Sequence, residues 1–134
     1  MQPEQPVYAH HPGRFFYFKD EDTGRIFSAP YEPCRVQAER WEFVAGSNTV
    51  EWTSRVEGLR ICISLRLAED RVLELWSLSV TNERSGVARL SIYPAFTVGY
   101  LSWMNQSASY DPDLNGILAR SVTPYQNVAD LPSV

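Results

Sequence analysis

The chain has 134 residues, 44% of them hydrophobic and 13% aromatic, which supports one domain with its own core and excludes disorder along its whole length. Its formal net charge of −4 argues against nucleic acid and anionic membranes as partners, because both are bound through clustered Lys and Arg. Residues 1–12 lack the apolar run of a secretory signal, and Cys34 and Cys62 are too few for a disulfide framework, so we expect a cytoplasmic protein with reduced thiols.

In chain order, residues 1–13 are expected to form a flexible tail and residues 14–134 a β-sandwich domain. Two short strands are predicted first, over residues 14–19 and 24–27. The following residues, 39–98, predict an antiparallel meander of five strands joined by short turns.

The clearest strand signal covers residues 59–67, where Leu and Ile alternate with Arg, Cys and Ser, so that every apolar side chain lies on one face. In the next strand Leu75 falls out of phase with Trp76, and we interpret this as a β-bulge. The last strand contains Pro94, which cannot donate a ladder hydrogen bond, so we expect this strand at a sheet edge or with a bulge.

The predicted fold class is all-β, because no segment has a sustained apolar repeat at helical spacing. A second sheet is the usual cover for the apolar face of an antiparallel sheet, which favours an antiparallel β-sandwich. The chain has too few further strands to form a second sheet that matches the meander. We therefore expect an incomplete part of a larger sandwich domain, completed by residues beyond Val134.

No complete catalytic site is predicted. Most acidic residues fall at turns, and the only histidines, His10 and His11, are adjacent in the tail, where a catalytic base would lack a partner. The chain has no metal-ligand spacing and no glycine cluster of the kind that cradles phosphate. We therefore assign no catalytic residue, no metal site and no cofactor.

Aromatic residues are the remaining clue to a ligand, because sugar rings stack on Trp and Tyr. Trp41, Trp52 and Trp76 are in phase with apolar residues on predicted strands, which favours core packing. After residue 98 the sequence has no period, and such segments often carry function. The candidate contacts with a substrate or a partner subunit lie in this segment and are Trp103, Asn105, Gln106 and Tyr110.

Four stretches resemble, in order and spacing, the N-terminal domain of the cellobiose phosphorylase family, which includes cellobionic acid phosphorylases. The stretches are YFKDEDTGRIFS at residues 17–28, DRVLELW at residues 70–76, RLSIYPAF at residues 89–96, and VGYLSWMNQ at residues 98–106 with SVTPY at residues 121–125. The last of these is most similar to the cellobionic acid branch.

The resemblance implies a β-sandwich from an inverting β-glycoside phosphorylase, a cytoplasmic homodimer that splits a disaccharide with inorganic phosphate to give a sugar 1-phosphate. In that family the proton-donating acid sits in an (α/α)₆ barrel that follows the sandwich, and this chain contains no barrel. We therefore expect a scaffold and dimerisation portion that is inactive alone, with the rest of the polypeptide as its partner.

Two alternatives from other functional classes remain open. One is a free-standing carbohydrate-binding module that holds an oligosaccharide through Trp103 and its polar neighbours. The other is a purely structural sandwich fragment that associates with itself through an uncovered apolar face.

Overall fold

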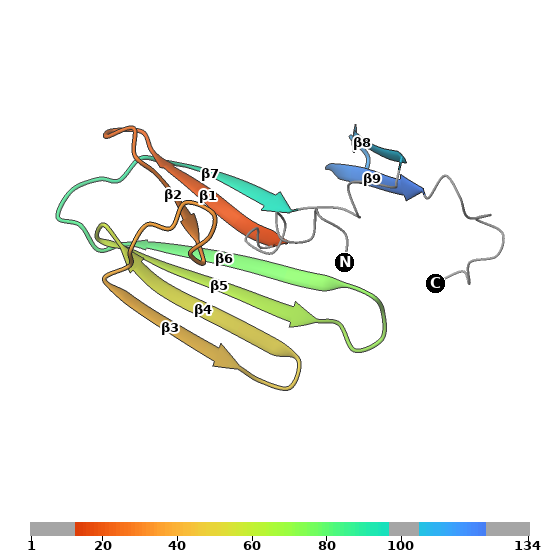
Figure 1. The fold of residues 1–134 in the computed structure, drawn as a ribbon, viewed down its shortest axis with the longest axis horizontal. Helices are drawn as coiled ribbons and strands as arrows, with labels where there is room; N and C mark the ends of the chain where they lie inside the picture. Colours follow the sequence, from red (N-terminus) through yellow and green to blue (C-terminus); the bar gives the residue numbers. More distant parts are fainter. Residues whose placement is uncertain (1–12, 97–104, 123–134) are drawn as a thin grey trace, which may run out of the picture. The chain divides into compact units, whose positions relative to one another are not determined.

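The computed structural model describes residues 13–96 and 105–122, and every regular element in these two ranges is a β-strand. The chain divides into two compact units, residues 1–96 and residues 97–134, and each is described by itself. The strands are β1 (Arg14–Asp20), β2 (Ile26–Ala29), β3 (Arg40–Ala45), β4 (Thr49–Val56), β5 (Leu59–Leu67), β6 (Glu74–Asn82), β7 (Leu90–Phe96), β8 (Asn105–Asp111) and β9 (Gly116–Val122) (Figure 1). The predicted all-β fold class is confirmed.

One layer of the first unit is a four-stranded antiparallel meander in the order β3-β4-β5-β6. Strand β5 spans Leu59–Leu67, the segment predicted from strict alternation. Its turn to β4 consists of Glu57 and Gly58, both with positive φ, which matches the right-handed twist of a two-residue hairpin.

The second layer has the order β2-β1-β7, so the prediction of a five-strand meander is wrong for its last strand. Strand β7 leaves the meander and pairs antiparallel with β1 along its whole length, from Leu90 opposite Asp20 to Phe96 opposite Arg14. Period-two alternation looks the same in either sheet, so the sequence did not reveal the change of partner. Pro94 lies in this strand, which is at a sheet edge as predicted.

The predicted bulge near Leu75 is also wrong. The register of β5 with β6 runs without a break from Leu59 opposite Asn82 to Leu67 opposite Glu74. Leu75 occupies an ordinary outward position opposite Arg66, and half of its surface is exposed. The alternation of apolar residues changes phase here because Leu75, an apolar residue, lies on the solvent-facing side of the strand. The strand contains no extra residue.

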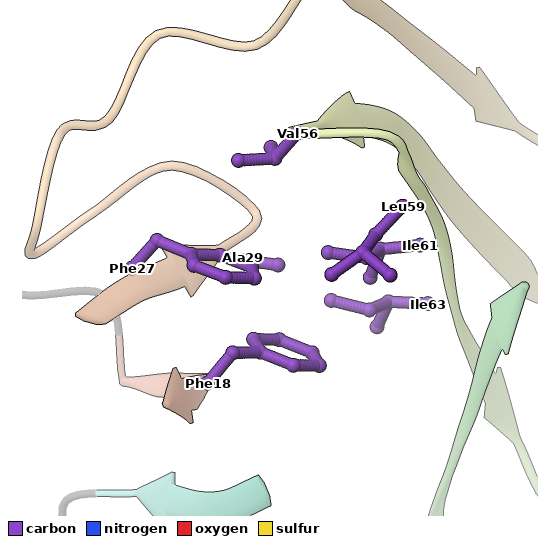
Figure 2. Close-up of a cluster of buried hydrophobic side chains, with 7 residues drawn as sticks. All are labelled: Phe18, Phe27, Ala29, Val56, Leu59, Ile61 and Ile63. Carbon is purple, nitrogen blue, oxygen red and sulfur yellow. The ribbon is translucent and has the colours of Figure 1, made fainter. Parts of the chain in front are cut away.

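The core of the first unit lies between the two sheets (Figure 2). Phe18, Phe27 and Ala29 of the three-stranded sheet point toward side chains of β4 and β5, and the rings of Phe18 and Phe27 stack at 5.0 Å. The side chains on the other side are Val56, Leu59, Ile61 and Ile63. Two sheets packed face to face over one core make a β-sandwich.

An ion pair between a partly buried arginine and a buried aspartate lies at one end of this core. Nη1 of Arg84 donates to Oδ2 of Asp20 at 2.6 Å, and Nε of Arg84 donates to the carbonyl oxygen of Glu57 at 2.8 Å. The pair therefore joins the end of β1, the β4–β5 turn and the connection from β6 to β7.

The second unit contains a two-stranded antiparallel hairpin in which β8 pairs with β9. Oδ1 of Asp111 accepts hydrogen bonds from the backbone N–H groups of Asp113 and Leu114 at 2.9 and 3.1 Å, and Asn115 has a φ of 48°. An Asx turn followed by a left-handed residue is a common way to close such a hairpin.

Candidate functional site

The structure describes the predicted contact residues only in part. Trp103 lies outside the described residues. Asn105 and Gln106 are the first two residues of β8, and the structure describes their backbone but not their side chains. Tyr110 lies near the end of β8, exposed, and its hydroxyl donates to Oδ1 of Asn115 at 2.7 Å. The assignment of these four residues as contacts therefore stays a prediction.

A cleft of about 530 Å³ opens in the first unit, lined by the start of β1, the start of β6 and the end of β7. Its volume lies in the range of small-molecule sites. The lining is mostly apolar and aromatic, with one charged pair. The residues are Arg14, Phe15, Phe16, Val72, Leu73, Glu74, Trp76, Pro94, Ala95 and Phe96.

Within this cleft, Nε of Arg14 lies 2.6 Å from Oε2 of Glu74, and the same oxygen accepts a hydrogen bond from the indole N–H of Trp76 at 2.9 Å. No sequence pattern predicts this group, because Arg14 and Glu74 belong to strands of different sheets. Chemically, the group offers a flat aromatic surface beside one cation and one carboxylate.

An aromatic row crosses the inner face of the four-stranded sheet and consists of Trp41, Phe43, Trp52 and Trp76. Successive ring centroids are 6.0, 5.8 and 5.7 Å apart, and the first and last pairs stack with interplanar angles of 4° and 7°. Trp52 and Trp76 are partly buried against the core, as predicted. Trp41 is more than half exposed, so its predicted core packing is wrong, because the three-stranded sheet does not extend over β3.

The described residues contain no arrangement suited to glycoside hydrolysis in the cleft. Such hydrolysis needs two carboxyl groups across the scissile bond, and Glu74 is the one carboxylate among the residues that line the cleft. Over residues 13–96 and 105–122, no three His, Cys, Asp or Glu side chains gather where they could hold a metal ion. The same residues include no helix long and apolar enough to cross a membrane.

Comparison with known proteins gives consistent matches. Residues 4–113 match the family model described as glycosyl hydrolase 94, supersandwich domain. Over 149 aligned positions the chain is 52% identical to a cellobionic acid phosphorylase of Neurospora crassa, an alignment that covers 97% of this chain and 19% of the relative. It is 27% identical over 112 positions to a 3-O-beta-D-glucopyranosyl-beta-D-glucuronide phosphorylase of Paenibacillus borealis, covering 84% of this chain and 14% of that protein.

The chain thus spans less than a fifth of the length of these two curated relatives. The matches confirm the resemblance found in the four sequence stretches.

Proposed function

Because the chain belongs to the glycosyl hydrolase 94 family through its supersandwich domain, we propose that it is the N-terminal scaffold and dimerisation portion of an inverting β-glycoside phosphorylase. The disaccharide would be of the cellobiose or cellobionic acid type. The observation that carries the proposal is the 52% identity to a cellobionic acid phosphorylase over nearly the whole chain.

The reaction would be phosphorolysis. An oxygen of inorganic phosphate attacks the anomeric carbon, the glycosidic bond breaks, and a carboxylic acid donates its proton to the leaving sugar oxygen. The products are a sugar 1-phosphate of inverted configuration and the free acceptor sugar. Since phosphate is the nucleophile, a single protein carboxyl group is enough and no further cofactor is needed.

This chain would not supply that acid. Glu74 is the one carboxylate that lines the described cleft, and its Oε2 already receives the indole N–H of Trp76 and lies beside Arg14. We therefore propose that the acid belongs to an (α/α)₆ barrel in the remainder of the same polypeptide. The sandwich then contributes folding, dimerisation and shaping of the active site, in a cytoplasmic enzyme.

Within this role, Trp103, Asn105, Gln106 and Tyr110 are proposed to contact substrate or the second subunit of a homodimer. Alanine substitution of each, in a chimera in which this chain replaces the matched segment of the Neurospora crassa phosphorylase, separates the two contacts. A raised KM for disaccharide identifies a substrate contact, whereas loss of the dimer in sedimentation identifies an interface contact. A substitution that moves neither quantity removes that residue from the proposed site.

The same chimera tests the function as a whole. We expect it to form glucose 1-phosphate from cellobionic acid or cellobiose in the presence of phosphate. A chimera that folds and yet forms no sugar phosphate from either disaccharide contradicts the proposal.

One observation favours a second function, carbohydrate binding without catalysis. The cleft combines the indole of Trp76 with Arg14 and Glu74, an arrangement that suits a sugar ring with polar groups at its rim. Titrating cello-oligosaccharides into the chain while following tryptophan fluorescence tests it. Saturable quenching that Trp76→Leu abolishes supports binding in the cleft, and an unchanged spectrum at millimolar sugar rejects it.

A further inference from the structure

Three arginines form one row across the outer face of the four-stranded sheet, and we call them the arginine row. Arg40 of β3 is opposite Arg55 of β4, and Arg55 is opposite Arg60 of β5. Arg60 lies between Leu59 and Ile61, which are buried on the inner face, so the side chains of the row point outward. Like charges directly opposite each other on neighbouring strands destabilise a sheet. Anions that bind the row therefore stabilise this arrangement.

Two carboxylates of the chain neutralise the arginine row only in part. Nε of Arg55 lies 3.0 Å from Oε2 of Glu83, and Nη2 of Arg55 donates to Oε1 at 3.1 Å. Nε of Arg60 is 3.8 Å from the same Oε1, which is beyond hydrogen-bond distance. Arg40 pairs with Glu42. Two carboxylates thus serve three guanidinium groups, and no hydrogen bond joins the Arg60 guanidinium to another described residue.

A hollow of about 200 Å³ lies at the arginine row. It is lined by the three arginines together with Glu42, Thr53 and Ser54. Thr53 is opposite Glu42, so it lies on the same outer face and adds a hydroxyl donor to the guanidinium groups. Sites for drug-sized molecules have volumes of about 300–1,000 Å³. This smaller hollow suits an ion or one small charged group, not a disaccharide.

The charges around the hollow indicate which anion it fits. Guanidinium groups bind carboxylates and phosphates through pairs of N–H donors. A single carboxylate would only repeat the contacts that Glu42 and Glu83 already make. A dianion such as phosphate carries enough charge to bind Arg60 and a neighbouring arginine together. An extended polyanion is disfavoured, because the two glutamates lie at the row and the chain has a net charge of −4.

We propose that the arginine row is a binding site for a small phosphate-type dianion, either inorganic phosphate or the phosphate group of a sugar phosphate. The site lies on the outer face of β3, β4 and β5, whereas the cleft at Arg14 and Glu74 is lined by β1, β6 and β7. The site uses only residues of this chain, so it does not depend on the proposed function.

Titration of the chain with sodium phosphate tests the site, at a pH where phosphate is mainly a dianion and with sodium chloride added to keep the ionic strength constant. The Nε–H resonances of Arg55 and Arg60 are followed by NMR in the ¹⁵N-labelled protein. A second titration uses glucose 1-phosphate. Saturable shifts with either ligand support the site, and the ligand that binds more tightly identifies the source of the phosphate group. Shifts that do not saturate with either ligand overturn the proposal.

A pair of arginine variants separates a local site from general attraction between charges. Arg60→Gln should weaken phosphate binding, read at Arg55, by at least about fivefold. Arg66→Gln is the matched control on the same face of β5, removes the same charge outside the row, and should change Kd by less than about twofold. A similar loss in both variants overturns the site. If Arg60→Gln does not fold, Arg40→Gln on the exposed edge strand β3 is compared with the same control.

Removal of the competing carboxylate should have the opposite effect. Glu83→Gln releases Arg55 from its two contacts, so phosphate should bind at least about threefold more tightly. Glu51→Gln is the control of equal charge, because Glu51 lies on the outer face of β4, opposite Ser64 and outside the row. Binding to the Glu83 variant that is no tighter than to the Glu51 variant contradicts the proposed site.

Discussion

Arg84 donates a hydrogen bond of 2.6 Å from Nη1 to Oδ2 of Asp20, whose side chain is fully buried. Oδ1 of the same carboxylate accepts the backbone N–H groups of Asp22 and Thr23, each at 3.0 Å. The two residues are 64 positions apart in the chain, so the pair fixes the three-stranded sheet to the meander at one end of the core.

Replacing Arg84 should destabilise the sandwich, because the Asp20 carboxylate would stay buried without its charged partner. We expect Arg84→Met to lower the urea midpoint clearly. The control is Arg89→Met, which removes a surface pair with Asp22 and should leave the midpoint almost unchanged. Equal midpoints for the two variants would show that the buried pair does not stabilise the fold.

Lowering the pH should reduce the free energy of unfolding, because the buried carboxylate of Asp20 becomes protonated. The hydrogen bond from Arg84, and then the backbone N–H of Thr23, lower the pKa of Asp20 from 3.8 to about 2. A carboxyl group whose pKa is lower in the folded chain than in the unfolded chain stabilises the folded state at pH values above its unfolded-state pKa. That stabilisation is lost as the pH falls through the pKa in the folded chain. The loss therefore falls between about pH 4 and about pH 2.

Urea midpoints at about pH 6 and about pH 3 test this sign. The natural chain should lose more stability over that interval than Asp20→Asn, which cannot titrate there. The variant keeps some acid sensitivity, because the pKa values of Glu21 and Asp70 are also lowered, by Lys19 and Arg71. A pH dependence as large in Asp20→Asn as in the natural chain would refute the assignment.

The two faces of the meander should respond differently to truncation. Ile61 is 1% exposed in the core, so Ile61→Ala should cost about 2–5 kcal/mol of unfolding free energy. Leu75 lies on the outer face, and Leu75→Ala should cost less than about 1 kcal/mol. Urea unfolding of both variants provides the comparison, and a similar loss in each would contradict the observed register.

Gly58 should not tolerate a side chain. Its φ is 73°, and an added Cβ would lie 2.9 Å from Cγ of Arg84, which is held by its bonds to Asp20 and Glu57. We expect Gly58→Ala to cost about 1 kcal/mol or more. Gly86→Ala is the control, because a Cβ there meets open space. Thermal unfolding midpoints of the two variants check the difference.

Local patterns in the sequence predicted most strands of the sandwich. Strict alternation predicted the bounds of β5. The missing N–H of Pro94 predicted an edge strand or a bulge, and β7 lies at a sheet edge. Alternation reports one strand at a time, however, and does not name the neighbouring strand. The transfer of β7 to the second sheet was therefore invisible, and an outward Leu75 was mistaken for a bulge.

Contacts across long separations in the chain escaped prediction for a related reason. Asp20 and Arg84 each look like ordinary turn residues, and Arg14 and Glu74 like strand ends, until the sheets pack together. The exposure of Trp41 depends on how far the covering sheet extends, which no residue near it encodes. Tyr110 was predicted as a contact from its irregular surroundings, and the structure places it in a regular hairpin strand.

The most direct test compares glucose 1-phosphate formation by the isolated chain and by the chimera, at equal molar concentration, with cellobionic acid and phosphate as substrates. If the chain is the scaffold of a phosphorylase, the chimera forms product at a steady rate and the isolated chain forms none above the buffer blank. Turnover by the isolated chain, or a folded chimera without activity toward cellobionic acid or cellobiose, would contradict that role.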